Sequence, residues 1–503
     1  MLEAAVTAFQ VIMSPEHFMF LFLGVLVGIG IGVLPGLGGM VGLALLMPLT
    51  YSLDPTSGIA MLVGMGAVTS ISDTFSSVLM GVPGSVASQA TVIDGYPMTQ
   101  KGEGARALSA AFIASLCGGL IGALVLTMAL PFAVPLVMAL GTPELLMLTF
   151  LALGMVAVLS GGNPFLGLVA AIGGLALGTI GSAPSSGTFR FTFDSDFLLD
   201  GVMLTSLAIG LFAIPEMIAV LSKGGSISQK RPTLGSGWMQ GVKDVVHHRL
   251  LIVRHSLVGA AIGILPGLGN SIIDWVNYSI VVRFAKDKSK FGYGDVRGVI
   301  APESATNAKE GGSFIPTLLF GIPGSGSMAL LLAAMVIMGV EPGPNLVVSN
   351  LEFVFVVVWS LALANIIGTT LAFLLSSQIT KIAFIPFAKV MPFLLLLMTL
   401  GAFQSSQHMA DLGMLVIFGT LGWVMRRTGI PRAPLLIGFV LSVLIEQYLW
   451  QVVSRYGMEW ITRPGVMIIG LIGLAIIGFS LTGGKKKIDS SLKPPKPAQG
   501  VEE

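Results

Sequence analysis

The sequence has few charged residues for its length. Charged side chains make up 10% of the 503 residues, whereas soluble domains carry roughly a quarter. Hydrophobic residues reach 54%, and the mean hydropathy is +0.90. This composition excludes a soluble protein with a single membrane anchor.

Cysteine and the common catalytic motifs are also scarce. Cys117 is the single cysteine, which excludes an internal disulfide and a thiolate metal cluster. The sequence contains no P-loop and no His-Glu-x-x-His motif. We therefore predict that the chain is not an enzyme and holds no cofactor or resident metal. The net charge of +2 does not indicate a nucleic-acid partner.

Apolar runs, by contrast, recur along nearly the whole chain. A helix needs about 20 apolar residues to cross the hydrocarbon layer of a membrane. We predict an all-α polytopic membrane protein with about 12 membrane segments, some of them broken or shorter than a full span. The clearest runs are Phe18–Leu34, Ala107–Leu130, Val253–Leu265, Val354–Leu375, Leu412–Met425, Leu435–Leu449 and Val466–Leu481.

Basic residues predict which loops face the cytoplasm. Lys and Arg gather in the segment Lys223–Arg254, in the loop Arg426–Arg432 and in the C-terminal tail, so we place all three in the cytoplasm. The first 16 residues contain neither Lys nor Arg, so we place the N-terminus outside and expect no cleavable signal peptide. The predicted division is an N-terminal repeat half at 1–222, a basic cytoplasmic connecting segment at 223–254, a C-terminal repeat half at 255–484 and a disordered cytoplasmic tail at 485–503.

Two motifs occur twice, in the same order and at nearly the same separation. "GVLPGLGG" at 32–39 recurs as "GILPGLGN" at 263–270, and "LMGVPGSVAS" at 79–88 recurs as "LFGIPGSGSM" at 319–328. Two homologous halves are the simplest explanation. The helix before Pro35 starts outside, whereas the helix before Pro266 starts in the cytoplasm. We therefore expect two inverted repeats with broken helices or re-entrant hairpins, an architecture common in secondary transporters.

The repeated motifs interrupt helices. Pro removes a backbone donor and Gly tolerates positive φ, so the freed backbone groups must line protein or a watery cavity. A restarting helix points its positive dipole end there, which attracts carboxylates. A plain kink is the alternative for any single break, but four paired breaks favour a binding site. The predicted substrate-binding residues are Gly36, Gly38, Ser85, Gly267, Gly269, Asn270, Ser271, Asn307, Ser325 and Ser327.

Ionisable residues at membrane depth predict a coupling site. Asp73 lies before the first Pro-Gly-Ser break, and Asp274 lies one turn past the second Pro-Gly-Leu-Gly. Either carboxylate could hold Na⁺ or carry a proton, and no other metal is expected. Thr74 and Glu303 complete the ion-coupling candidates. We expect Lys309 and Glu310, in contrast, to lie in a solvated loop with local ion pairs.

Several of these stretches resemble one protein family. "GVLPGLGG", "DGYPMTQKGEGARAL", "GILPGLG" and "KFGYGDVRGVIAPESATNAKEGGSFIPTLLFGIPGS" stand in the order typical of the large membrane subunit of tripartite tricarboxylate transporters, the TctA-type permease. The resemblance runs through nearly the whole chain. It implies a bacterial inner-membrane subunit that imports carboxylates of the tricarboxylate or dicarboxylate class, coupled to a Na⁺ or H⁺ gradient by alternating access. It also implies two protein partners, a small membrane subunit of about four helices and a periplasmic solute-binding protein.

The chain departs from the family pattern near the expected site. Thr306 stands where the family usually has Asn, "SISDTFSS" replaces a Tyr-Gly-Gly-Ser run, and "NSIIDWVNY" adds an Asp and a Trp. These differences leave the particular carboxylate open. A stand-alone anion carrier or channel, which needs no soluble receptor, is the alternative that shares every fold-level feature.

Overall fold

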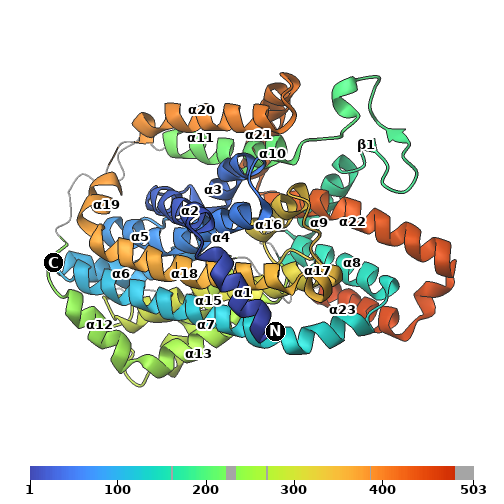
Figure 1. Cartoon of the computed structure of the whole chain (residues 1–503). Helices are drawn as coiled ribbons and strands as arrows, with labels where there is room; N and C mark the ends of the chain where they lie inside the picture. The colour runs from blue at the N-terminus through green and yellow to red at the C-terminus, as the bar shows by residue number, and fades with distance from the viewer. Residues whose placement is uncertain (160–162, 223–233, 268–269, 384, 386, 482–503) are drawn as a thin grey trace.

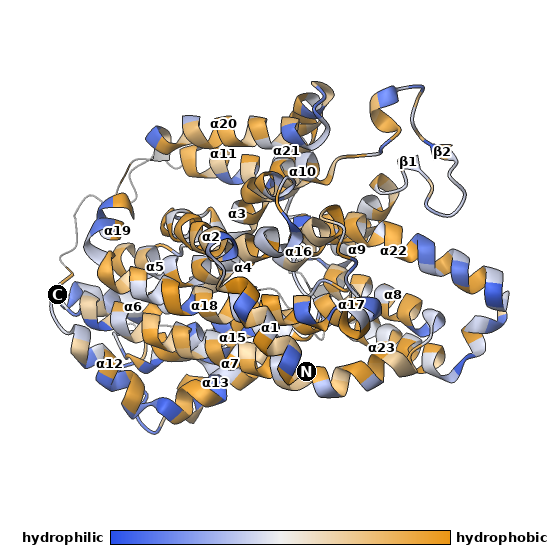
Figure 2. Ribbon diagram, in the orientation of Figure 1, coloured by the Kyte–Doolittle hydropathy of each residue, from blue (hydrophilic) through white to orange (hydrophobic). Residues whose placement is uncertain are grey.

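A computed structural model shows a chain built almost entirely of helices (Figure 1). It describes residues 1–159, 163–222, 234–267, 270–383, 385 and 387–481. By length and composition, seven helices within these residues can cross a membrane, and six further apolar helices are shorter. Hydrophobic residues cover most helices along their length, whereas hydrophilic residues gather on α12 (Trp238–His247) (Figure 2). The all-α membrane fold is confirmed, while the count of 12 segments and the inversion stay predictions.

The elements follow the chain in this order. Residues 1–222 form α1 (Leu2–Ile12), α2 (Pro15–Val33), α3 (Gly38–Leu46), η1 (Met47–Thr50), α4 (Pro55–Ser72), α5 (Thr74–Met80), η2 (Val86–Ser88), α6 (Thr91–Gln100), α7 (Gly104–Ala139), α8 (Thr142–Leu159), α9 (Pro164–Leu177), β1 (Gly181–Ser182), β2 (Phe189–Arg190), η3 (Asp196–Leu198), α10 (Leu204–Ala208), η4 (Ile209–Ala213) and α11 (Ile214–Ser222). After α12 come α13 (Arg249–Gly263), α14 (Asn270–Phe284), α15 (Arg297–Phe320), α16 (Gly326–Ile337), α17 (Pro344–Ser349), α18 (Leu351–Leu374), α19 (Ser376–Ala383), α20 (Phe387–Ser406), α21 (Ala410–Thr428), α22 (Arg432–Tyr456), η5 (Glu459–Thr462) and α23 (Pro464–Leu481).

Two small features complete this order. The element η4 is a π-helix, and β1 pairs antiparallel with β2. The predicted boundary between 254 and 255 lies inside α13. Residues 223–233 of the predicted connecting segment and the predicted tail at 485–503 lie outside the described residues.

The predicted breaks are present, and they occur in matched pairs. The first Pro-Gly-Leu-Gly separates α2 from α3, and Gly36 has φ +86°. The second follows α13, and Gly267 also has φ +86°. In each half the glycine of this motif donates its N–H to the glycine carbonyl of the Pro-Gly-Ser motif, with 2.9 Å from Gly36 to Gly84 and 3.1 Å from Gly267 to Gly324. In each half, the two breaks therefore supply hydrogen-bond partners for each other's backbone groups.

The two halves interlock through glycine contacts between helices. Helix α7 lies against α15, where a Cβ on Gly118 would come 2.1 Å from the Ser304 carbonyl oxygen. Helix α18 lies against α4, where a Cβ on Gly368 would come 2.5 Å from a Val68 methyl group. Small residues allow such close approach between membrane helices. Each half thus contributes a long helix that packs on the other half, and neither is a separate globular unit.

Buried apolar side chains form two clusters rather than one. The first cluster draws on α2, α4, α5, α7, α15 and α18. The second draws on α3, α8, α9, η4, α20, α21 and α22. Helices α4 and α16 belong to both, with Val63 and Leu331 in the first cluster and Met65 and Leu330 in the second. Helix α2 also contributes to both, with Ile29 in the first cluster and Ile31 in the second, so the clusters meet along these three helices.

A buried carboxylate joins the first half to the second beside α6. Asp94 lies on α6 and is fully buried. One carboxylate oxygen accepts the N–H groups of Gly292, Gly294 and Asp295 at 2.8–2.9 Å, and the other accepts the Tyr278 hydroxyl at 3.0 Å. The three N–H donors lie in the segment between α14 and α15, and Tyr278 lies on α14 itself. The "DGYP" stretch therefore holds the loop that positions α15.

Asp94→Asn tests this anchor. An amide replaces one acceptor oxygen by a donor that faces either N–H groups or a hydroxyl, so we expect a loss of about 2–4 kcal/mol in the free energy of unfolding. The measurement is thermal unfolding of the purified protein, together with protease cleavage of the loop at 286–290. Asp54→Asn is the matched control, because exposed Asp54 caps α4 and Asn caps helices about as well. Equal unfolding of wild type and Asp94→Asn would contradict the anchor.

Candidate functional site

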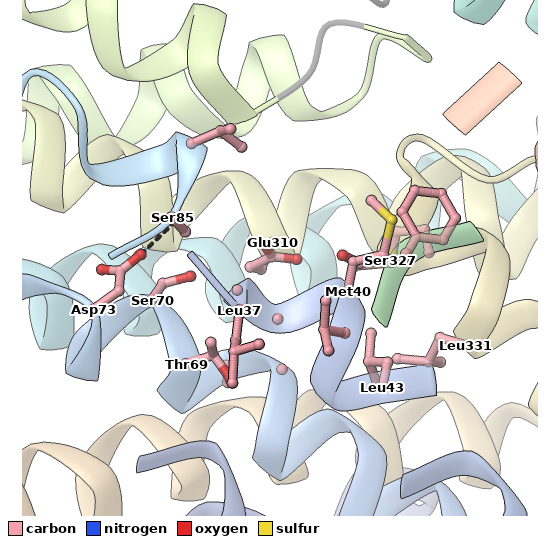
Figure 3. A pocket seen from close by; sticks show the side chains of 18 of the residues that line it. Leu37, Met40, Leu43, Thr69, Ser70, Asp73, Ser85, Glu310, Ser327 and Leu331 are labelled. Atoms are coloured by element: carbon pink, nitrogen blue, oxygen red, sulfur yellow. Dashed lines mark hydrogen bonds between the residues drawn. The ribbon is translucent and has the colours of Figure 1, made fainter. Parts of the chain in front are cut away.

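A cavity of about 200 Å³ lies where the two halves meet (Figure 3). A single water needs roughly 10–15 Å³ on the same measure, so this space is many times larger than one water molecule needs. Its lining comes from the break between α2 and α3, from α4, Ser85, Val86, η4 and α11, and from α15, α16, α18 and α22. The lining residues belong to both apolar clusters, so the cavity lies at the border between them.

One wall of the cavity is the exposed backbone of the first helix break. Gly36, Leu37, Gly38 and Gly39 all line it. Helix α3 begins at Gly38, and no side chain caps its first turn. The first N–H groups of a helix lack intrahelical partners and carry the positive end of the helix dipole. This wall therefore favours an anion.

Hydroxyl groups and a carboxylate form the adjoining wall. Ser70 and Asp73 come from the end of α4, and Ser85 lies directly across from Asp73 (Figure 3). The Ser85 hydroxyl donates to Asp73 Oδ2. The other oxygen, Oδ1, is buried and has no hydrogen-bond partner among the described residues. A buried carboxylate oxygen without a partner is costly unless it takes up a proton or a cation.

Two further carboxylates hold the segment that carries Ser85. Glu303 on α15 accepts hydroxyl groups from Thr74 at 3.1 Å, Thr91 at 2.8 Å and Ser115 at 2.9 Å. Asp274 on α14 accepts the Ala90 N–H, and its Oδ1 is buried without a partner among the described residues. Neither side chain lines the cavity. The chain from Ser85 to Thr91 is thus tied to three acidic side chains at three successive points.

The remaining predicted residues lie apart from the cavity or outside the described part. Gly267 is bonded to Gly324, and Ser325 caps α16 by accepting the Met328 N–H at 3.3 Å. Asn307 is buried between α7 and α18, where it donates to the Ser115 carbonyl at 3.1 Å and to Asn365 at 3.3 Å. Gly269 lies outside the described residues, as do the side chains of Asn270 and Ser271 at the start of α14. Gly36, Gly38, Ser85, Ser327 and Asp73 are the predicted residues that line the cavity.

The expectation of a solvated loop at Lys309 and Glu310 was wrong. Both lie in the middle of α15, where Lys309 is 1% exposed. Lys309 Nζ pairs with Glu310 Oε1 at 2.8 Å, and Glu310 faces the cavity (Figure 3). The pair of glycines that follows resembles a loop signal. In the folded chain, however, Gly311 and Gly312 lie against the backbones of α7 and α13.

Sequence reasoning also missed the ionic residues at the η4 end of the lining. Glu216 on α11 and Arg432 at the start of α22 both line the cavity. Arg432 pairs with Glu216 at 2.8 Å. The sequence placed Arg432 in a basic loop, and no local pattern links it to an acidic residue so far away along the chain.

Comparison with known proteins gives a family match and two similar sequences. The model of the "Tripartite tricarboxylate transporter TctA family" matches residues 18–437. An Agrobacterium vitis protein described as "Uncharacterized 52.8 kDa protein in TAR-I ttuC' 3'region" is 30% identical over 476 residues, which cover 94% of this chain and 95% of that protein. A second A. vitis protein, "Uncharacterized protein in TAR-II ttuC' 3'region", is 32% identical over 222 residues, which cover 44% of this chain and 91% of that protein.

Thiol labelling tests whether the cavity is open to water. In a Cys117→Ala background, we expect Ser327→Cys to react with a small anionic methanethiosulfonate reagent, because Ser327 lines the cavity. Ser304→Cys is the control with the same chemical change, since Ser304 is fully buried in α15. The measurement is the mass of the labelled protein against time. Labelling of Ser304→Cys as fast as Ser327→Cys would contradict the described cavity.

Proposed function

Because the chain belongs to the tripartite tricarboxylate transporter TctA family, we propose that it is the large membrane subunit of a transporter that imports carboxylates. The family is a transporter family rather than an enzyme family. In this proposal the subunit spans the bacterial inner membrane with its C-terminus in the cytoplasm. It works with a small membrane subunit of about four helices and with a periplasmic solute-binding protein. Besides the substrate it takes up only the coupling ion, Na⁺ or H⁺.

The observation that carries this proposal is the cavity beside the first broken helix. A carboxylate needs hydrogen-bond donors and positive potential once it leaves water. The start of α3 supplies both at Gly38 and Gly39. Ser70, Ser85 and Ser327 add hydroxyl groups to the same lining. The apolar lining residues, such as Leu331, give the hydrocarbon part of a substrate a surface to pack against.

Coupling to a cation follows from the charges around the same space. Asp73, Glu216 and Glu310 line the cavity together with Arg432. Glu216 and Glu310 have cationic partners, but Asp73 has a hydroxyl partner and an unused buried oxygen. An anion that enters beside Asp73 is repelled unless Asp73 is neutralised. A proton on Asp73, or Na⁺ bound to it, removes that repulsion. The anion then binds only together with the cation, so the two are transported together.

Alternating access is supported by the division into two apolar clusters. The cavity borders both clusters, and α4 and α16 belong to each. A sliding movement of one cluster past the other along these helices would expose the cavity to one side of the membrane and then to the other. An elevator-type motion is the version of this proposal in which the Pro-Gly-Ser segments travel with the substrate.

Asp73→Asn tests the proposal. We expect uptake of labelled citrate or succinate to fall at least about tenfold, equivalent to about 1.4 kcal/mol, because Asn cannot release a proton or neutralise a cation. The test uses cells of the native host that carry the variant in place of the wild-type chain. Asp287→Asn is the matched control, since Asp287 lies in an exposed loop.

Three results would contradict parts of the proposal separately. Unchanged uptake by Asp73→Asn would remove Asp73 from coupling. Uptake that persists after both the Na⁺ and H⁺ gradients are dissipated would exclude gradient coupling. Carboxylate uptake that does not change when the chain is deleted would exclude carboxylates as the substrate class.

A further inference from the structure

Of the described residues that line the cavity, Arg432 is the one with a positive charge. It is the first residue of α22, and Pro431 provides no side-chain cap to that helix. Its guanidinium donates to the Leu211 carbonyl at 3.0 Å and to Glu216 Oε1 at 2.8 Å. Its Cζ also lies 5.3 Å from the centre of the Phe212 ring. These contacts come from η4 and α11 and hold the guanidinium beside the cavity.

Glu216 has two cationic partners rather than one. Arg426, near the end of α21, donates to Glu216 Oε2 and to the Pro215 carbonyl. The Arg432 side chain is 17% exposed and the Arg426 side chain is 36% exposed. Arg432 lines the cavity, whereas Arg426 does not. The Glu216 carboxylate therefore lies between the guanidinium of Arg432 at the cavity and the more exposed guanidinium of Arg426.

This arrangement allows one carboxylate to replace another. Removing one partner of a buried ion pair is strongly destabilising, because it leaves an uncompensated charge. Here Glu216 keeps Arg426 if Arg432 turns away, so the exchange leaves no acidic group unpaired. A guanidinium presents a planar fork of donors that matches a carboxylate, and it stays charged at any physiological pH. The uncapped start of α22 adds positive potential at the same point.

We infer that Arg432 binds a carboxylate of the transported substrate, in exchange for Glu216, and that Arg426 holds Glu216 during the exchange. This inference rests on the proposed carboxylate transport and names the residue that recognises the substrate. The substrate spans from the hydroxyl groups and helix start beside Asp73 to the guanidinium beside Phe212. In the absence of substrate, Glu216 occupies the position of that carboxylate and keeps Arg432 neutralised.

The test is binding of citrate and succinate to the purified full-length chain, measured as the shift in thermal unfolding against ligand concentration at constant ionic strength. We expect Arg432→Gln to weaken binding at least about tenfold, the effect of a lost charge-assisted hydrogen bond. Glu216→Gln should bind several-fold more tightly, because the substrate no longer competes with a carboxylate for Arg432. Arg427→Gln is the matched control, since Arg427 lies in the last turn of α21, does not line the cavity and stacks on Trp423.

The outcomes separate the inference from the proposed function. A wild-type chain that binds neither citrate nor succinate would overturn carboxylate binding in the cavity and the inference with it. Binding by the wild type that survives in Arg432→Gln would overturn the inference alone. Equal weakening by Glu216→Gln and Arg432→Gln would also overturn it, because that pattern means that the ion pair only holds α22 on α11. If Arg432→Gln unfolds without ligand, Arg432→Lys keeps the charge and should bind with intermediate affinity.

Discussion

The structure depends on one constraint, which is that every backbone polar group at membrane depth needs a partner. Four helix breaks free such groups, and the lipid offers them no hydrogen-bond partners. The chain meets the constraint by pairing the breaks within each half, through Gly36 with Gly84 and Gly267 with Gly324. What the pairing leaves unsatisfied at the start of α3 faces the cavity. This polar wall of the cavity is thus a direct consequence of the helix break.

Glycine acts twice in this design, for two different reasons. At Gly36 and Gly267 it permits a positive φ that other residues adopt only with strain. At Gly118 and Gly368 it permits close contact between helices, because any side chain there would collide with the neighbouring helix. These contacts join α7 to α15 and α18 to α4. They make two repeated halves into one interlocked body with two apolar clusters and a cavity on their border.

The acidic side chains that line the cavity or lie near it differ in how fully they are partnered. Glu303 accepts hydrogen bonds from three hydroxyl groups, whereas Glu310 pairs with Lys309 and Glu216 pairs with two arginines. Among the described acidic residues that line the cavity, Asp73 stands apart, with one hydroxyl partner and one unused oxygen. Buried ionisable groups in membranes mark ion and substrate pathways because they are costly to keep. This unequal satisfaction is the basis for proposing coupling at Asp73 and substrate recognition on the arginine side of the cavity.

The sequence by itself determined the membrane class, the helical fold and the position of the breaks. These properties depend on local chemistry, namely apolar length, the missing donor of Pro and the backbone freedom of Gly. It also identified Asp73, Ser85 and Ser327 at the cavity, because each lies within a few residues of a repeated motif. Ser325 met the same criterion, and Asn307 was chosen because an amide both donates and accepts hydrogen bonds. The fold places Asn307 at a helix interface and Ser325 at a helix cap.

Only the tertiary structure decided which distant residues meet. The sequence-based prediction of a solvated loop at Lys309 and Glu310 was wrong, because two adjacent glycines occur both in loops and where helices pack closely. The sequence linked neither Arg432 to Glu216 nor Ser115 to Glu303, because those pairs lie on helices far apart along the chain. Such partners are brought together by the shape of packed helix surfaces, and that shape is a property of the whole chain rather than of any segment.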